Sequence, residues 1–431
     1  MNPASASTAS ASPARQLTGS TLFLLAGLAA LGALSTNIIL PAFPAIGAQL
    51  QASPQRLGLT LSAFFLAFAL GQLLVGPLSD RIGRKWLVLG GLATFFAGSV
   101  LCALAGSLSM LVLGRVVQAL GACAASVLSR AIARDIFDGA ALARALAMTM
   151  TAMAAAPGFS PLVGGLLQSA VGWRATFVIV GLCGLVLAVH FHRALGESHP
   201  ADRRTRVSAG VIVASYGRLA VDPLFAFPAL AVSLLIGGLY TYFSLAPAII
   251  MGGIGLNAFQ FGLFFAVTVF VVFGVGFLAP RLAVGWGHRN AALAGFAVAL
   301  AGSAVLFLGG GTPGLATVTV SWVVFILGMG VANPLGTALT LQPFASRAGL
   351  ASALLGFLQM AIAATGALVA NALPFAPVVS LAIVLTACSG LALVALLAGN
   401  QIHLHPSNPV HCELKCNHWG RSGFDVGRET E

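Results

Sequence analysis

The stretch GPLSDRIGRK, from Gly76 to Lys85, decides the fold because it concentrates charge in a chain that otherwise has very little. One acid and three cations lie in this stretch between two long apolar runs, whereas only 7% of all residues are charged and 58% are hydrophobic. A soluble domain usually carries about 25% charged residues. Most of the chain must therefore face lipid, and the stretch is expected to be a short polar connection between two membrane spans.

Twelve apolar segments, each long enough for a membrane span of about 20 residues, can be separated along the chain. In the first half they cover residues 18–41, 56–78, 86–106, 109–133, 144–168 and 173–194. In the second half they cover residues 224–249, 259–280, 290–310, 314–338, 348–371 and 375–398. The pattern predicts an all-α integral membrane protein with twelve transmembrane helices.

The spacing of these segments also predicts the domain organisation. The longest polar connection separates six spans from six. The predicted parts are a disordered Ala/Ser-rich tail at 1–16, a six-helix bundle at 17–195, a cytoplasmic linker at 196–222, a second six-helix bundle at 223–399 and a cytoplasmic tail at 400–431.

The distribution of cations predicts the orientation in the membrane. One set of alternate connections receives Arg81, Arg84, Lys85, Arg130, Arg134, Arg144, Arg193, Arg203, Arg204, Arg206, Arg218, Arg281, Arg289 and Arg347. The other set receives only Arg56 and Arg174. Because cytoplasmic loops are enriched in Lys and Arg, the first side and both termini are expected in the cytoplasm. The net charge of +11 is then a topological signal, and no nucleic-acid partner is expected.

The residues of the opening stretch have a physical rationale as a charged hairpin. Gly76 and Gly83 allow the backbone to turn and to approach a neighbour, and Asp80 could cap a nearby helix N-terminus. Arg84 and Lys85 could pair with carboxylates at other helix ends. Such a group could hold two bundles together on one face and release them as they separate. The alternative, that the cations only anchor a cytoplasmic loop, does not account for the acid and the two glycines.

The same stretch resembles, at every position, the hairpin signature of the major facilitator superfamily, G-x-L-S/A-D-R-x-G-R-K. RVVQALGA from Arg115 and APGFSPLVGG from Ala156 are similar to the fourth- and fifth-span motifs of its twelve-span drug:proton antiporters. STNIILPAFPAI from Ser35 and GWRATF from Gly172 resemble the Bcr/CflA group of bicyclomycin and chloramphenicol resistance exporters. The resemblance implies two six-helix bundles around a central cavity and export of drug-like molecules by alternating access, with proton antiport.

By this resemblance the charged hairpin is a conformational latch. Asp80 would meet the N-terminus of the eleventh span, and Arg84 would pair with Asp135 at the cytoplasmic end of the fourth. The latch residues are then Gly76, Asp80, Arg81, Gly83, Arg84, Lys85 and Asp135.

Arg115 is the only cation that the pattern places well inside a span. A charge at that depth costs several kcal/mol, so such residues usually have a function. With Gln118 one helical turn away, Arg115 is expected to bind substrate or to couple protons. The alternative is that Arg115 lies near the outer interface and extends its head group into it.

The fifth span contains two prolines and three glycines, which would disrupt a soluble helix. In a membrane bundle, kinks are tolerated and small residues allow close helix packing. The resemblance implies a pivot and seal between the two halves, and the alternative is ordinary close packing. The pivot residues are Pro157, Gly158, Pro161, Gly164 and Gly165.

Asn37 departs from the Bcr/CflA pattern, in which the first span reads S/T-D-M-Y-L-P-A and its Asp is the implied proton site. An amide cannot take up and release a proton near neutral pH. No other Asp or Glu lies in the middle of a predicted span. Either an acid at a span end, such as Asp135, carries the proton, or the protein is a facilitator or is coupled differently.

The predicted transport cavity is apolar with a few uncharged polar groups, which suits neutral amphiphiles. Gln72 and Ser244 are further candidates for its lining. For each residue the alternative is that it faces lipid or a neighbouring helix. The cavity and coupling residues are Asn37, Arg115, Gln118, Tyr240, Tyr242, Asn333 and Gln359.

The remaining expectations concern partners and rival functions. No cofactor or metal is expected, although His and Cys residues in the tail leave metal binding as a lesser alternative to disorder. An integral-membrane enzyme would need clustered His, Asp, Glu or Cys at membrane depth, and the spans lack such a set. A metabolite exporter of nucleosides or amino-acid-like compounds, an uncoupled facilitator and a non-transporting scaffold remain open. One chain supplies a complete path, so a monomer in the lipid bilayer is expected.

Overall fold

The computed structural model describes residues 18–204 and 208–404, and within these ranges the chain is helical and contains no strand. The predicted tail at 1–16 and most of the His/Cys-rich tail lie outside the described residues. The tail residues outside the described ranges include His405, His411, Cys412, Cys416 and His418.

The first half of the chain forms six long helices. Their bounds are α1 Gly19–Asn37, α3 Pro54–Ile82, α4 Arg84–Ala103, α5 Leu108–Ile136, α6 Gly139–Ala170 and α7 Arg174–Ala194. After α1 the chain continues through a short 3-10 turn, Leu40–Ala42, into α2, Phe43–Leu50.

The second half repeats this plan. Its long helices are α9 Pro223–Ala246, α10 Ala258–Leu308, α11 Leu315–Leu341, α12 Ala348–Ala372 and α13 Pro377–Leu404. A π-helical segment, η3 (Pro247–Gly253), extends α9, and α10 is broken at Gly287, where φ is 78° and ψ is 152°. The helix label α10 therefore covers two spans.

Eleven described stretches are long and apolar enough to cross a membrane, and one of them, Leu315–Ala372, comprises both α11 and α12. Twelve spans result, which confirms the predicted all-α membrane architecture. The linker between the halves contains a 3-10 turn, Ala201–Arg203, and a helix that the apolar pattern did not predict, α8, Ala209–Ala220.

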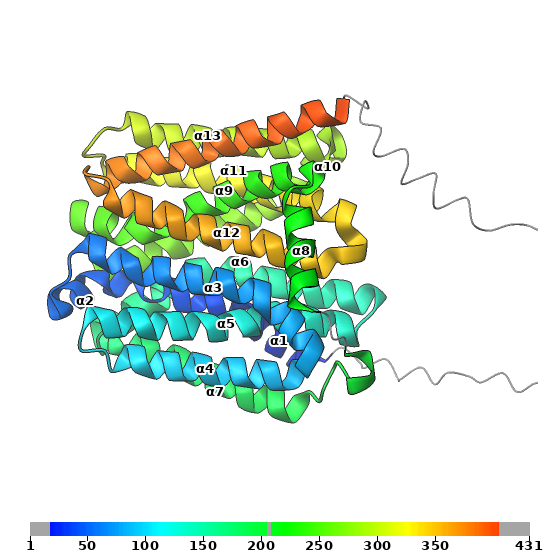
Figure 1. The fold of residues 1–431 in the computed structure, drawn as a ribbon. Helices are drawn as coiled ribbons and strands as arrows, with labels where there is room; N and C mark the ends of the chain where they lie inside the picture. Colours follow the sequence, from blue (N-terminus) through cyan, green and yellow to red (C-terminus); the bar gives the residue numbers. More distant parts are fainter. Residues whose placement is uncertain (1–17, 205–207, 405–431) are drawn as a thin grey trace, which may run out of the picture.

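The helices lie roughly side by side, and Figure 1 shows that both ends of the described chain lie at one face of the molecule, together with α8. We call this the hairpin face, because the α3–α4 turn lies there. The opposite face carries the connections at residues 51–53, 104–107 and 171–173, and we call it the loop face.

Local sequence accounts for where the spans begin. Side chains of Ser53, Ser107 and Asp222 accept hydrogen bonds from backbone N–H groups in the first turns of α3, α5 and α9. Asn257 and Gln260 form a reciprocal capping box at the start of α10. These caps satisfy amide groups that a helix start leaves unpaired, and they define where these spans begin.

The two bundles meet along two helix pairs, α3 with α12 and α6 with α10. The helix α8 packs at the hairpin face against α12, and the Tyr216 hydroxyl donates to the Leu73 carbonyl of α3 at 3.3 Å. The linker helix is thus attached to both bundles.

Candidate functional site

Arg84 joins three helix ends at the hairpin face. Its Nη1 lies 2.6 Å from Asp80 Oδ1 at the end of α3, and its Nε lies 3.1 Å from Asp135 Oδ2 at the end of α5. The guanidinium also donates to the Ser79 hydroxyl. The side chains of Arg84 and Asp135 are only 11% and 19% exposed, so this pair is partly shielded from water.

Glu197, which the sequence interpretation missed, completes this group. Its Oε1 accepts the backbone N–H of Arg84 at 2.8 Å, so the carboxylate caps the start of α4. The Ser198 hydroxyl donates to Asp135 Oδ2 at 3.1 Å, and Arg204 Nη2 lies 3.7 Å from Glu197 Oε2. The signal in the sequence was a lone acid shortly after the sixth span, on the side of the hairpin. We call Asp80, Arg84, Asp135 and Glu197 the hairpin cluster.

The other expected latch residues contribute less to these contacts. Neither Arg81 nor Lys85 forms a side-chain ion pair within the described chain, although the Lys85 N–H lies 3.3 Å from Glu197 Oε2. Asp80 hydrogen-bonds Arg84 and not the first turn of α12, where it was expected. Gly83 has φ 99°, a value that favours glycine, and Gly76 has open space beside it.

Arg115 lies on α5 and is fully buried among the neighbouring helices. Its Nη1 donates to the Ser35 carbonyl of α1 at 3.0 Å and to Gln118 Oε1 at 2.5 Å. The guanidinium carbon lies 4.2 Å from the centroid of the Phe64 ring, a cation–π contact. Gln118 in turn donates to the Ser99 hydroxyl of α4 at 2.8 Å. We call Ser35, Ser99, Arg115 and Gln118 the Arg115 cluster.

This cluster has unused hydrogen-bonding capacity. Nε and Nη2 of Arg115 are buried and have no hydrogen-bond partner among the described residues. The same holds for Oδ1 of Asn37, which lies on α1 outside this cluster. Asn37 uses only its amide N–H₂, which donates to the Ala33 carbonyl at 2.9 Å. Leaving such groups unpaired costs about 1–3 kcal/mol each, and more for a charged group. A water molecule or a polar acceptor on a ligand would satisfy the two guanidinium nitrogens.

The expected cavity residues of the second half lie in different surroundings. The Tyr240 ring contacts Phe65 of α3, with centroids 4.8 Å apart, and so joins the two bundles. Tyr242 stacks on Trp322 with ring centroids 3.8 Å apart, and its buried hydroxyl has no hydrogen-bond partner in the part of the chain that the structure describes. Asn333 and Gln359 are partly exposed, and their side chains make no hydrogen bond within the described chain.

The expected pivot lies inside a continuous α6, since both Pro157 and Pro161 are within the helix. Gly164 packs against the carbonyl of Ile38, the residue directly after α1, and Gly165 packs against the Ala258 carbonyl at the start of α10. A side chain on either glycine would overlap the facing backbone. Gly158 is also buried. This stretch therefore packs α6 closely against both bundles near the loop face.

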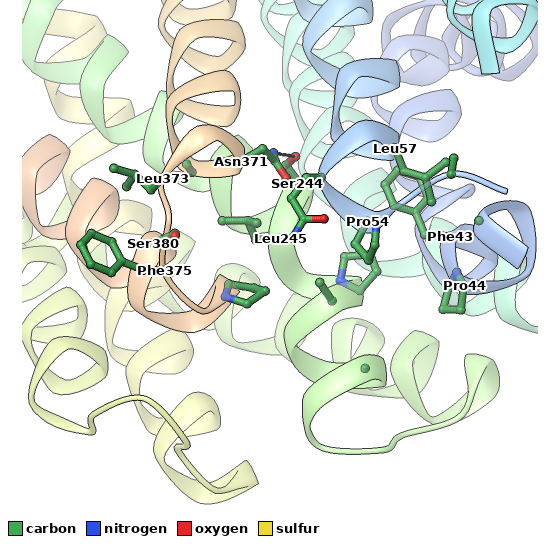
Figure 2. A pocket seen from close by; sticks show the side chains of 18 of the residues that line it. Phe43, Pro44, Pro54, Leu57, Ser244, Leu245, Asn371, Leu373, Phe375 and Ser380 are labelled. Atoms are coloured by element: carbon green, nitrogen blue, oxygen red, sulfur yellow. Dashed lines mark hydrogen bonds between the residues drawn. The ribbon is translucent and has the colours of Figure 1, made fainter.

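A pocket of about 400 Å³ opens at the loop face between the two bundles. Figure 2 shows Phe43, Pro54 and Leu57 on one side of it and Ser244 and Asn371 on the other. Of the residues expected to line a cavity, only Ser244 belongs to it. The pocket is built from helix ends that are distant in the sequence, so no local pattern indicated it.

The six acids of the described chain all lie at helix ends or in the linker at the hairpin face, and none lies in the middle of a span. They are Asp80, Asp135, Asp138, Glu197, Asp202 and Asp222. In the same part of the chain, no group of three or more His, Cys, Asp or Glu is placed to hold a metal ion.

The profile of the Major Facilitator Superfamily matches residues 25–367, well over half of the chain. The chain belongs to the major facilitator superfamily. It is therefore a multi-pass membrane protein of a family that transports small molecules.

Curated relatives place this major facilitator among drug-resistance transporters. The chain is 33% identical to the uncharacterized MFS-type transporter YdgK of Bacillus subtilis, over 78% of this chain and 85% of the relative. It is 32% identical to a chloramphenicol resistance protein of Pseudomonas aeruginosa, over 66% of this chain and 67% of that relative. It is 27% identical to multidrug resistance protein D of Escherichia coli, over 80% of this chain and 86% of that relative. The expected Bcr/CflA resemblance is confirmed by such relatives.

Solved structures agree with the major facilitator fold. A bacterial homolog of the human lysosomal transporter Spinster, in an inward-facing and occupied conformation, superposes with a TM-score of 0.68. The alignment covers 91% of this chain and 98% of that one at 18% identity. At this identity the likeness concerns the fold alone.

Proposed function

We propose that this major facilitator exports drug-like, uncharged small molecules from the bacterial cytoplasm by alternating access. The observation that carries the proposal is the fully buried Arg115 with two unpaired guanidinium nitrogens. An incompletely satisfied cation at that depth is expected to have a ligand. Relatives named for chloramphenicol and multidrug resistance support drug-like molecules as that ligand.

The proposed location is the bacterial inner membrane, with the hairpin face in the cytoplasm. The cations concentrate at the hairpin face, whereas Arg56 and Arg174 lie at the loop face. Both termini would then be cytoplasmic. The monomer is proposed as the working unit, because one chain contains both bundles.

In the proposed mechanism a neutral molecule offers an acceptor to Arg115 and apolar surface to rings such as Phe64 and Tyr240. Binding shifts the balance between conformations only through its different affinity for each. The glycine contacts of α6 would seal the loop face until the bundles separate, with the Pro157–Gly165 stretch as the pivot.

Proton antiport is proposed with Asp135 as the carrier, in place of an acid at position 37. Protonation would remove the charge of Asp135 and weaken its contact with Arg84, whose Nε lies 3.1 Å away. Proton uptake would thus loosen the hairpin cluster, which joins α3, α4 and α5. An uncoupled facilitator is the alternative, favoured by the amide at Asn37. No catalytic role is proposed for any residue.

Retention of chloramphenicol and of a panel of dyes in bacteria that lack their own pumps tests the function. Expression of the protein is expected to lower retention, and a protonophore is expected to restore it. Arg115→Ala should abolish the effect, and Arg115→Lys should not rescue it, because an ammonium cannot replace the planar guanidinium. Arg56→Ala is the matched control, since it removes an exposed cation.

Each outcome separates the candidates. Export that the protonophore does not affect, and that never exceeds equilibration, would indicate a facilitator. Absence of an effect for every compound would contradict drug export and would direct the assay to nucleosides and amino-acid-like metabolites. A folded protein with no flux for any of these would indicate a scaffold.

A further inference from the structure

The loop-face pocket is formed by both bundles rather than by one. Phe43 of α2 and Pro54 of α3 line it from the first bundle, and Ser244 of α9 and Asn371 of α12 line it from the second. Its volume of about 400 Å³ lies within the usual range of small-molecule sites, roughly 300–1,000 Å³. Among the described residues, no charged side chain lines it.

Asn371 lies where the bundles touch beside this pocket. Its Nδ2 donates to the Ala367 carbonyl at 2.7 Å. It also donates to the Ser244 hydroxyl at 3.3 Å (Figure 2). Its Oδ1 accepts no hydrogen bond from any described residue. The amide packs on Gly58 of α3 so closely that a Cβ there would lie 2.5 Å from Nδ2. The same side chain thus closes the contact between α3 and α12 and offers an unused acceptor.

We propose that this pocket is a second ligand site for an uncharged amphipathic molecule. Asn371 Oδ1 would accept a hydrogen bond from a donor group on that molecule, and Phe43 and Phe375 would contact its apolar part. An ion would find no opposite charge in the lining, so its burial there would be costly. Rings and alkyl groups would instead find apolar side chains to contact. The inference rests on the proposed function, because the ligand is the exported molecule held at the loop face before release. Separation of α3 from α12 would break the Gly58–Asn371 contact and open the pocket.

Protection from thiol labelling tests the site on the purified full-length protein in nanodiscs. Each native cysteine is replaced by alanine, and the exposed pocket residue Gln55 is changed by Gln55→Cys. Chloramphenicol, as the neutral probe, should slow maleimide labelling by about fivefold when the site is about 80% occupied. Labelling of a Leu104→Cys protein should not change, since Leu104 is 67% exposed at the loop face and outside the pocket.

Two substitutions in the labelled protein should abolish or reduce this protection. Ala48→Trp places an indole in the pocket from the exposed side of α2 and should abolish it. Asn371→Leu keeps the volume but removes the acceptor and should weaken binding by about tenfold, as expected for one lost hydrogen bond. Ala170→Trp is the matched control, because Ala170 is exposed near the loop-face end of α6 and outside the pocket. Size-exclusion profiles verify that each variant is folded.

The proposal is overturned if chloramphenicol and two further neutral aromatic probes give no protection, or if protection survives Ala48→Trp. Arg115→Ala should stop export but leave protection intact. Protection without export by the unaltered protein would contradict the proposed function and retain the site. Export without protection would contradict the site alone. The absence of both export and protection would contradict the proposed function and the proposed site.

Discussion

The two hairpins that join the second to the third span of each bundle have the same backbone turn but different chemistry. Gly83 (φ 99°, ψ 158°) and Gly287 (φ 78°, ψ 152°) occupy the same conformation, in which glycine is favoured. Around Gly83 the hairpin cluster links three helices and the linker. Around Gly287 there is no acid, and Arg289 donates to the Leu396 carbonyl at 2.9 Å. The shared turn reflects the repeated fold, and the charge cluster is a property of the first bundle only.

Arg84→Gln should produce the largest effect, because it leaves the mostly buried Asp135 without its cation. Breaking a shielded pair in this way costs about 2–4 kcal/mol of unfolding free energy. Arg289→Gln should cost about 1 kcal/mol, since it removes one hydrogen bond to a carbonyl. Thermal unfolding of the purified variants measures the difference. Arg81→Gln, which removes an exposed cation without an ion pair, is the control, and equal losses for Arg84→Gln and Arg289→Gln would contradict the asymmetry.

The turn glycines offer a second test, with effects of about 1–3 kcal/mol. Gly287→Ala should cost about 1–2 kcal/mol from its positive φ alone, because the space beside it is open. A Cβ at Gly83 would lie 2.5 Å from Glu197 Oε2 and 2.6 Å from Arg204 Nη2, so Gly83→Ala must also displace the cap of α4. The expected extra loss is about 1 kcal/mol. Combining Gly83→Ala with Glu197→Gln should then be less than additive, and full additivity would mean that the cap is not disturbed.

The linker helix α8 contacts the first bundle through Tyr216, and this should give a smaller effect that depends on pH. Burial, with the nearby negative charge of Asp80, raises the pKa of the Tyr216 hydroxyl above its ordinary value. The folded state thus holds the proton longer than the unfolded state. The contribution is present below about pH 10, the ordinary tyrosine pKa, and is lost as pH rises through the folded pKa.

Tyr216→Phe should therefore cost about 1 kcal/mol at pH 7, from the lost bond to Leu73. It should also reduce the fall in stability above pH 10. Thermal unfolding between pH 7 and 11 measures both quantities. The same pH dependence in the variant and the unaltered protein would show that another group is responsible.

The sequence was sufficient for the twelve spans, because long apolar runs can only be covered by lipid or by one another. It was also sufficient for the hairpin, in which Asp80, Gly83 and Arg84 are neighbours along the chain. It did not reveal Glu197 as the cap of α4, because that contact depends on where α7 ends in space. The helix α8 was missed because a short amphipathic helix at a membrane surface lacks an apolar run. The loop-face pocket was missed because Ser244 and Asn371 come together only after the bundles have packed.

The smallest effect is expected from restoring the missing charges to the second hairpin. Val284 and His288 stand relative to Gly287 as Asp80 and Arg84 stand relative to Gly83, and Val284 is 90% exposed. The double variant Val284→Asp with His288→Arg should gain at most about 0.5 kcal/mol, the usual value of an exposed ion pair. It lacks a third partner, because α11 ends at Leu341 without an acid equivalent to Asp135. A double-mutant cycle by thermal unfolding measures this coupling, and a value near that of the Arg84–Asp135 pair would mean that the turn alone creates the cluster. A value near zero would show instead that Asp135 and Glu197, brought from α5 and the linker, make the first hairpin different.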